Sequence, residues 1–131
     1  GQNDPIVVRL MPTGALDNTF DGDGFLSFFP SINDDYAEGV VILPDGDIMV
    51  AGGTYQGATS MGDLFMARIN SDGTLDSTFD GDGLLIKDFL GYSNEDFYDI
   101  VRRTDGTLLV GGQMNGSATV VAITPTGTVD N

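Results

Sequence analysis

The chain has 131 residues, and its 20 acidic residues against 5 Lys and Arg give a formal net charge of −15. This length fits one ordinary domain, and so few cations cannot form the basic surface that nucleic acid or an anionic membrane surface requires. Cys and His are absent, which excludes disulfides, thiolate nucleophiles and histidine-based zinc or acid–base chemistry, and no apolar run approaches the roughly 18 residues of a membrane span.

Short apolar runs alternate with turn signals along the whole chain. Their lengths fit strands, and no window keeps the i, i+3, i+4, i+7 spacing of an amphipathic helix. Each turn triplet ends in Gly, which adopts the positive φ that hairpin turns need. The sequence therefore predicts antiparallel hairpins and at most short helical turns. In chain order the runs are Ile6–Leu10, Val40–Leu43, Ile48–Ala51, Leu64–Ile69, Leu84–Ile86, Ile100–Val101, Leu108–Val110 and Val120–Ile123.

Internal repetition is the strongest pattern in the sequence. Residues 9–24 and 68–83 are related by an offset of 59, with 10 of 16 positions identical. A further stretch from Asp35 recurs from Asp96 after deletion of one residue, and a third copy begins at Val121. We expect a single module over residues 1–131, composed of repeat one at about 5–62, repeat two at about 63–118 and the start of repeat three at 119–131.

Each repeat reads as four strands and one further extended piece. The expected pieces are VVILP, DIMVAGG, LFMARIN and TLDSTF, then a DGDG loop and LLIKDF. Four or more antiparallel strands in about 55–60 residues are typical of one propeller blade. We therefore expect an all-β fold of β-propeller-type repeats with about two blades. The alternative is a two-repeat β-sandwich or barrel.

The segments RLMPTGALDNTFDGDG and RINSDGTLDSTFDGDG, with DGDIMVAGG and DGTLLVGG, resemble the delta-sixty repeat, a bacterial β-propeller repeat of secreted and surface-attached proteins. The resemblance spans nearly the whole chain. It implies blade architecture, a secreted or cell-surface address with the signal peptide removed, and no established catalytic residue. The sequence departs from the pattern at Ala122, where earlier copies have Arg. It departs again at Arg102 and Arg103, where repeat one has Ile42 and Leu43, which leaves open whether that strand is buried on both faces.

Two loops carry oxygen ligands at alternating positions. The segment from Asp17 to Gly24 recurs at 76–83, with ligands at positions 1, 3, 5 and 7 and Gly at position 6. This spacing resembles the first half of an EF-hand calcium loop. The second half fails, because position 12 is Phe28 or Lys87 instead of Glu, and position 7 normally offers a backbone carbonyl. The candidate metal ligands are Asp17, Asp21, Asp23, Asp76, Asp80 and Asp82.

A structural interpretation of these loops competes with calcium and is favoured. In it, the Asp side chains cap backbone N–H groups, and Phe20 and Phe79 plug the core between blades. Arg9 and Arg68 stand in apolar strands shortly before Asp17 and Asp76. A half-buried Arg requires a carboxylate partner, so we expect each Arg to staple its own repeat. Calcium is retained as a weak site, because a millimolar extracellular supply would suit it.

No constellation of residues predicts an enzyme. Ser residues lack a His partner, and no Gly-rich phosphate loop follows a strand and opens a helix. Twenty acids guarantee some pairs near the roughly 5–10 Å spacing of glycoside hydrolases, so their presence is uninformative. Tyrosines could form a sugar-stacking surface, although such residues are more often ordinary strand residues. They are Tyr36, Tyr55, Tyr92 and Tyr98.

We therefore expect a structural or interaction module. The alternatives are a calcium-dependent or carbohydrate-binding, lectin-like module and, less favoured, a carboxylate-based hydrolase. Propellers usually have four to eight blades, so about 2.2 repeats, cut inside a unit, leave the ring open. The expected partners are further repeats of a longer chain or other copies of this one, with protein or carbohydrate as further candidates. Three chains would give a six-bladed ring if Val120–Ile123 paired into a neighbour's incomplete blade.

Overall fold

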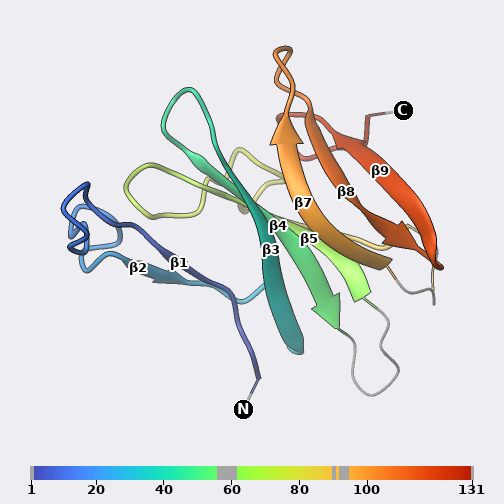
Figure 1. Ribbon diagram of the computed structural model, residues 1–131, viewed down its shortest axis with the longest axis horizontal. Helices are drawn as coiled ribbons and strands as arrows, with labels where there is room; N and C mark the ends of the chain where they lie inside the picture. The colour runs from blue at the N-terminus through green and yellow to red at the C-terminus, as the bar shows by residue number, and fades with distance from the viewer. Residues whose placement is uncertain (1, 56–61, 90, 92–94, 131) are drawn as a thin grey trace.

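The computed structural model describes residues 2–55, 62–89, 91 and 95–130, and this part of the chain is all-β. Its nine strands form three antiparallel sheets that follow one another along the molecule (Figure 1). No helix among the described residues has the length and apolar character to cross a membrane. Sheet 1 contains β1 (Ile6–Val8) and β2 (Phe25–Ser27); sheet 2 contains β3 (Asp34–Ile42), β4 (Ile48–Tyr55), β5 (Gly62–Ile69) and β6 (Leu84–Lys87); sheet 3 contains β7 (Glu95–Arg102), β8 (Leu108–Met114) and β9 (Ser117–Ile123).

The three sheets are parts of the same repeating blade. In sheet 2 the strands pair in the order β3-β4-β5-β6, as expected for one complete four-stranded blade. The pair β1-β2 repeats β5-β6, because Val7 faces Leu26 as Met66 faces Leu85, at an offset of 59. The hairpin β7-β8 repeats β3-β4 at an offset of 60. The complete blade therefore takes two strands from each sequence repeat.

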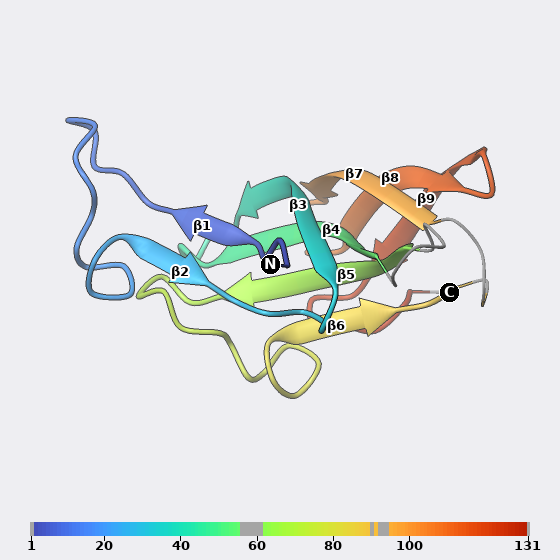
Figure 2. The same ribbon diagram turned by 90° about the horizontal axis from the view of Figure 1, so that it is seen from below.

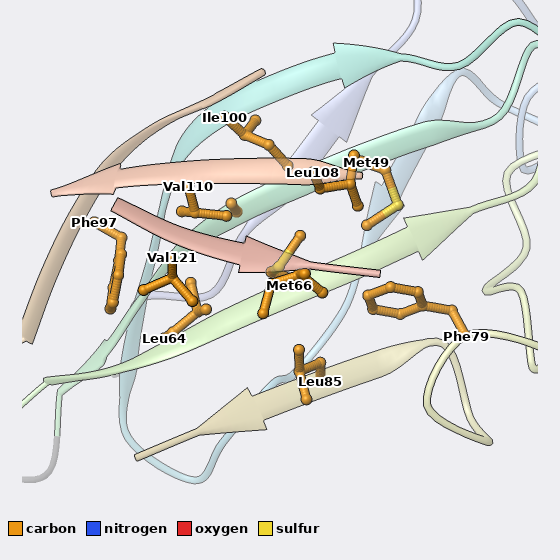
Figure 3. Close-up of a cluster of buried hydrophobic side chains, with 12 residues drawn as sticks. Met49, Leu64, Met66, Phe79, Leu85, Phe97, Ile100, Leu108, Val110 and Val121 are labelled. Carbon is orange, nitrogen blue, oxygen red and sulfur yellow. The ribbon is translucent and has the colours of Figure 1, made fainter. Parts of the chain in front are cut away.

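Alternate side chains of sheet 2 enter two different hydrophobic cores. Val50 and Phe65 belong to the cluster shared with sheet 1, whereas Met49 and Met66 belong to the cluster shared with sheet 3. All four are at most 2% exposed. Figure 3 shows the second cluster, in which sheets 2 and 3 contribute facing side chains. A sheet buried on both faces, between two others, is propeller-type stacking and differs from the two-repeat sandwich or barrel alternative.

Two details of the sequence interpretation are corrected. The segment TLDSTF is not a strand: its only described ladder contact is a single bridge from Leu75 to Ile69, and LLIK provides the fourth strand. The cause is local, because Asp76 accepts a hydrogen bond from the backbone N–H of Thr78 and closes a turn. The one-residue deletion predicted between the stretch from Asp35 and its repeat from Asp96 is also absent. Both β3 and β7 carry a bulge at the same place, so the two strands match without a gap.

The first strands of sheets 2 and 3 lie against each other, and we call this side of the molecule the inner edge (Figures 1 and 2). A Cβ built on Gly39 of β3 would stand only 2.9 Å from the backbone nitrogen of Ile100 in β7. Arg102 and Arg103, which replace apolar residues of repeat one, lie at the exposed C-terminal end of β7 and directly after it. Ile42, the counterpart of Arg102, is itself 62% exposed, so the substitution leaves no buried charge.

Candidate functional site

The two DGDG loops have the same backbone geometry and join successive repeats. Asp21 and Asp80 both adopt φ 48°, and a glycine with positive φ follows each of them. The backbone N–H of Asp21 donates to the carbonyl oxygen of Asp72 at 2.7 Å, and that of Asp80 donates to Thr126 at 3.1 Å. Each loop therefore rests on the turn of the following repeat.

The first Asp of each loop is engaged inside its own repeat. Asp17 Oδ1 accepts from the backbone N–H and hydroxyl of Thr19, and its Oδ2 lies 2.9 Å from Arg9 Nε. Asp76 has the same arrangement with Thr78 and with Arg68 Nε, also at 2.9 Å. The hydrogen bonds from threonine are the main cause that lowers the pKa of both carboxyl groups. These carboxylates fix the loop to the preceding strand.

The remaining candidate metal ligands do not converge in the described structure. Asp23 and Asp82 each accept a backbone N–H two residues ahead, from Phe25 and Leu84, both at 2.9 Å. No group of three or more carboxylates within 4.8 Å of one another forms from the loop aspartates among the described residues. Their calcium binding stays a prediction, and the observed geometry is that of side chains capping the backbone of the loop.

The two arginines differ in their surroundings. Arg9 Nη2 donates to the Thr19 hydroxyl at 2.7 Å, and Nη1 donates to the Ser71 carbonyl of the following repeat. The guanidinium carbon also lies 4.8 Å from the centroid of the buried Phe20 ring. Arg68 instead binds Asp45 and Asp47 at 3.0 and 2.9 Å, in addition to Asp76. Both arginines are occupied by protein groups, as a structural staple requires.

Three other carboxylates gather where sheets 2 and 3 meet. Asp63 at the start of β5, Asp88 after β6 and Glu95 at the start of β7 have oxygens within 4.8 Å of one another. Asp63 and Glu95 are buried, and Glu95 accepts the backbone N–H of Phe89 at 3.0 Å. Carboxylate oxygens of this kind could hold a hard divalent cation. Sequence reasoning missed the group, because its members come from three separate segments of the chain and share no motif.

A related pair of acids occurs one repeat earlier. Asp35 holds the position of Glu95 in β3 and, like it, is buried and accepts a hydrogen bond from the loop before its strand, here from Ser31 at 2.9 Å. Burial raises the pKa of the Asp35 carboxyl, and the negative charge of Asp4 adds to this effect. Asp4 precedes Asp63 by 59 residues and is therefore its counterpart in the repeat. The pair of Asp4 and Asp35 thus repeats the pair of Asp63 and Glu95. An acidic pair lies at each junction between sheets, and this repetition favours a structural role for the pair.

A polar network crosses the inner edge from sheet 2 to sheet 3. The Tyr55 hydroxyl donates to Asp96 Oδ1 at 3.1 Å, and Gln113 Nε2 donates to Asp96 Oδ2 at 2.8 Å. Burial, followed by the hydrogen bond to Asp96, raises the pKa of Tyr55 to about 12. The Tyr36 ring meets Tyr55 edge-on with centroids 5.2 Å apart, and Tyr98 is half exposed. Tyr92, the fourth candidate for a sugar-stacking surface, lies outside the described residues.

Both ends of the stack of sheets present apolar side chains to solvent. On sheet 1 and the residues directly after β1, four side chains that we call the front face are 42–60% exposed. Their counterparts 59 residues later are buried or half-buried against sheet 1: Phe65, Ala67, Ile69 and Leu84. On sheet 3, Val120 is 68% exposed, whereas its counterpart Met66 is fully buried. The front face consists of Ile6, Val8, Leu10 and Phe25.

The comparisons with known proteins agree with this architecture. The family described as "Domain of unknown function (DUF5122) beta-propeller" matches residues 1–20 and 43–79. This likeness supports a β-propeller repeat. The matched segments contain both sets of Arg, Asp and plugging Phe, although together they span less than half of the chain. No curated protein matches the chain.

Replacing Thr78 with valine is expected to raise the pKa of Asp76 toward the ordinary 3.8, because the hydroxyl donor to its carboxylate is lost. The folded-state pKa is lowered, so the ionised carboxylate stabilises the fold above its unfolded-state pKa, and this contribution disappears as the pH falls through the folded-state pKa. The variant should therefore lose less stability on acidification. A carboxylate NMR titration measures the pKa directly. Thr74→Val is the control, since it should raise the pKa of Asp72 and leave Asp76 unchanged; an unchanged Asp76 pKa in Thr78→Val contradicts the assignment.

Proposed function

We propose that this chain is a structural and interaction module of a secreted or surface-displayed bacterial protein, of the delta-sixty repeat type, and that it associates through its open sheet faces. The observation that carries the proposal is the front face of sheet 1. Phe65 and Ala67 of sheet 2 are fully buried, whereas their counterparts Ile6 and Val8 are about half exposed. Contiguous exposed apolar surface of this kind marks interaction sites.

The chemistry of the described residues also favours this role over catalysis. Arg9, Arg68, Asp17 and Asp76 bind one another or the turns beside them. The plugging residues Phe20 and Phe79 are fully buried. A repeated residue that holds one blade to the next supports architecture, so the expected partners are further repeats of the same type or other copies of the chain.

A calcium-dependent or carbohydrate-binding role is the second candidate. The acidic group of Asp63, Asp88 and Glu95 brings together carboxylate oxygens, the ligand type that a hard divalent cation takes. The network of Tyr55, Asp96 and Gln113 combines an aromatic ring with hydrogen-bonding groups, as sugar-binding surfaces do. Its position at the inner edge breaks the repeat, because Asp96 has Tyr36 as its counterpart. A carboxylate-based hydrolase would also need a site that differs between the repeats. The hydrolase remains the least supported alternative.

Phe25→Glu is expected to weaken self-association at least about tenfold, because it places a charge within the front face, where a well-packed apolar contact is worth more than about 1.4 kcal/mol. Sedimentation of the unmodified chain and the variant over a range of concentrations measures the effect. Ile32→Glu is the matched control, since Ile32 is 85% exposed and belongs to neither open face. Equal weakening by both substitutions would contradict the assignment of the face.

A further inference from the structure

A groove of about 260 Å³ lies on the inner edge between β1 and β3. Glu38 is its only charged lining residue, and the others are aliphatic or glycine. Val40 projects from β3 into this region and is 62% exposed, whereas Val50 at its floor is buried. The lining residues are Ile6, Val7, Val8, Ala37, Glu38, Gly39, Val40 and Val50.

The next blade shows what covers this surface when it is complete. Ile100 pairs with Val110 as Val40 pairs with Val50, so Ile100 is the counterpart of Val40. Ile100 is only 3% exposed, because β4 and β5 of the preceding sheet pack against β7. Phe97, the counterpart of the exposed Ala37, is likewise buried. The same positions are thus exposed in β3 and covered in β7.

β1 also differs from its counterpart β5 in the pairing of its backbone edges. β5, its counterpart, is paired on both sides: with β6 on one edge and with β4, from Gly62 to Ile69, on the other. β1 pairs with β2, and no other described strand pairs with it. Its open edge borders the groove. The groove therefore occupies the place that the counterparts of β3 and β4 would fill.

Resting on the proposed interaction role, we infer that this groove is a strand-addition site for a two-stranded antiparallel hairpin with the chemistry of β7-β8. The second strand of the hairpin pairs with β1 by main-chain hydrogen bonds, and its apolar side chains cover Val40 and Val50. Such a strand carries apolar residues on both faces, followed by Gly-Gly within the strand, as Gly111-Gly112 stands in β8. The second glycine is required because a Cβ at Gly112 would lie 2.0 Å from the Asp96 carbonyl oxygen of the partner strand.

An intact second copy of the chain is not the occupant of this groove. The outer edge of its β8 is already paired with β9, from Leu108 with Ile123 to Met114 with Ser117. β1 and β9 are both counterparts of β5, so they would compete for that single edge. A hairpin without a third strand avoids this competition.

The test uses a labelled synthetic peptide of residues 95–115 and the full chain, with binding followed by fluorescence anisotropy. We expect saturable binding, shifts of the Ile6–Val8 backbone amide signals in NMR spectra, and at least about tenfold weaker binding by Val40→Glu, which places a charge under the added strand. A peptide carrying Val110→Asp should bind equally poorly. Ile32→Glu is the control and should bind as the unmodified chain does. Because Val40 is exposed, its variant should fold, and Ala37→Glu provides a second probe of the groove.

The outcomes separate this inference from the proposed function. If the peptide fails to bind, or binds Val40→Glu and Ala37→Glu at full strength, the inference is overturned, whereas loss of self-association in Phe25→Glu would still support the proposed function. If Val40→Glu abolishes self-association without any peptide, a second copy occupies the groove, and the inference is again overturned. Peptide binding by a chain that never self-associates would support the groove and contradict the proposed self-association.

Discussion

Replacing Phe79 with alanine is expected to lower the free energy of unfolding by about 3–5 kcal/mol, the usual cost of removing a buried aromatic ring. The ring comes from a loop outside the sheets and is fully buried in the core between sheets 2 and 3 (Figure 3). It is held there by the turn in which Phe79 donates its backbone N–H to Asp76 and accepts that of Gly83. The loop cannot collapse into the resulting cavity without breaking these bonds. Urea unfolding measures the loss.

Phe20→Ala should cost a similar amount, because Phe20 plugs the other core in the same manner. Phe29→Ala is the control: Phe29 is 66% exposed, so its replacement should change stability by no more than about 0.5 kcal/mol. A small effect of Phe79→Ala, comparable with that of Phe29→Ala, would contradict the role of the loops as plugs between blades.

Gly112→Ala is expected to cost about 3 kcal/mol or more, since no local adjustment can accommodate the new methyl group. Its Cβ would lie 2.0 Å from the Asp96 carbonyl oxygen and 2.8 Å from the Phe97 Cα atom, both in the bulged part of β7. Backbone atoms must move for it to fit. The thermal or urea unfolding transition reports the loss.

The neighbouring residue provides a matched control. A Cβ at Gly111 meets no atom within 4 Å, so Gly111→Ala should leave stability within about 0.5 kcal/mol of the unmodified chain. Gly52→Ala should repeat the effect of Gly112→Ala, because its Cβ would lie 1.9 Å from the Tyr36 carbonyl oxygen. Equal stability of the two adjacent variants would mean that the bulge of β7 is not formed as described.

The hairpins could be predicted from the sequence because their signals are local. A turn such as Pro44-Asp45-Gly46 is encoded by adjacent residues, and Gly46 adopts φ 92°. The fourth strand was misassigned because a side-chain hydrogen bond from Thr78 to Asp76 outweighs the strand propensity of TLDSTF. The recurrence of the same strand pairs followed from repetition, which relates distant segments without any knowledge of their contacts.

The acidic group at the junction of sheets 2 and 3 could not be predicted in the same way. Asp63 and Glu95 meet only because β5 and β7 belong to successive sheets, and their separation in sequence carries no motif. The loop aspartates show the converse. Asp17 and Asp21 have the spacing of cation ligands, yet Asp17 is turned toward Thr19 and Arg9 by hydrogen bonds that the spacing does not reveal.

The native mass of the unmodified chain, measured with and without a chelator at about 0.15 M salt, tests the central claim most directly. Salt at this level screens the repulsion between chains of charge −15 beyond about 8 Å. The account predicts assemblies of two or more chains that persist in chelator, because apolar faces form the contact, with an interface above about 1,000 Å². A folded monomer at every concentration would contradict it, and assemblies that dissociate in chelator would favour the calcium-dependent alternative.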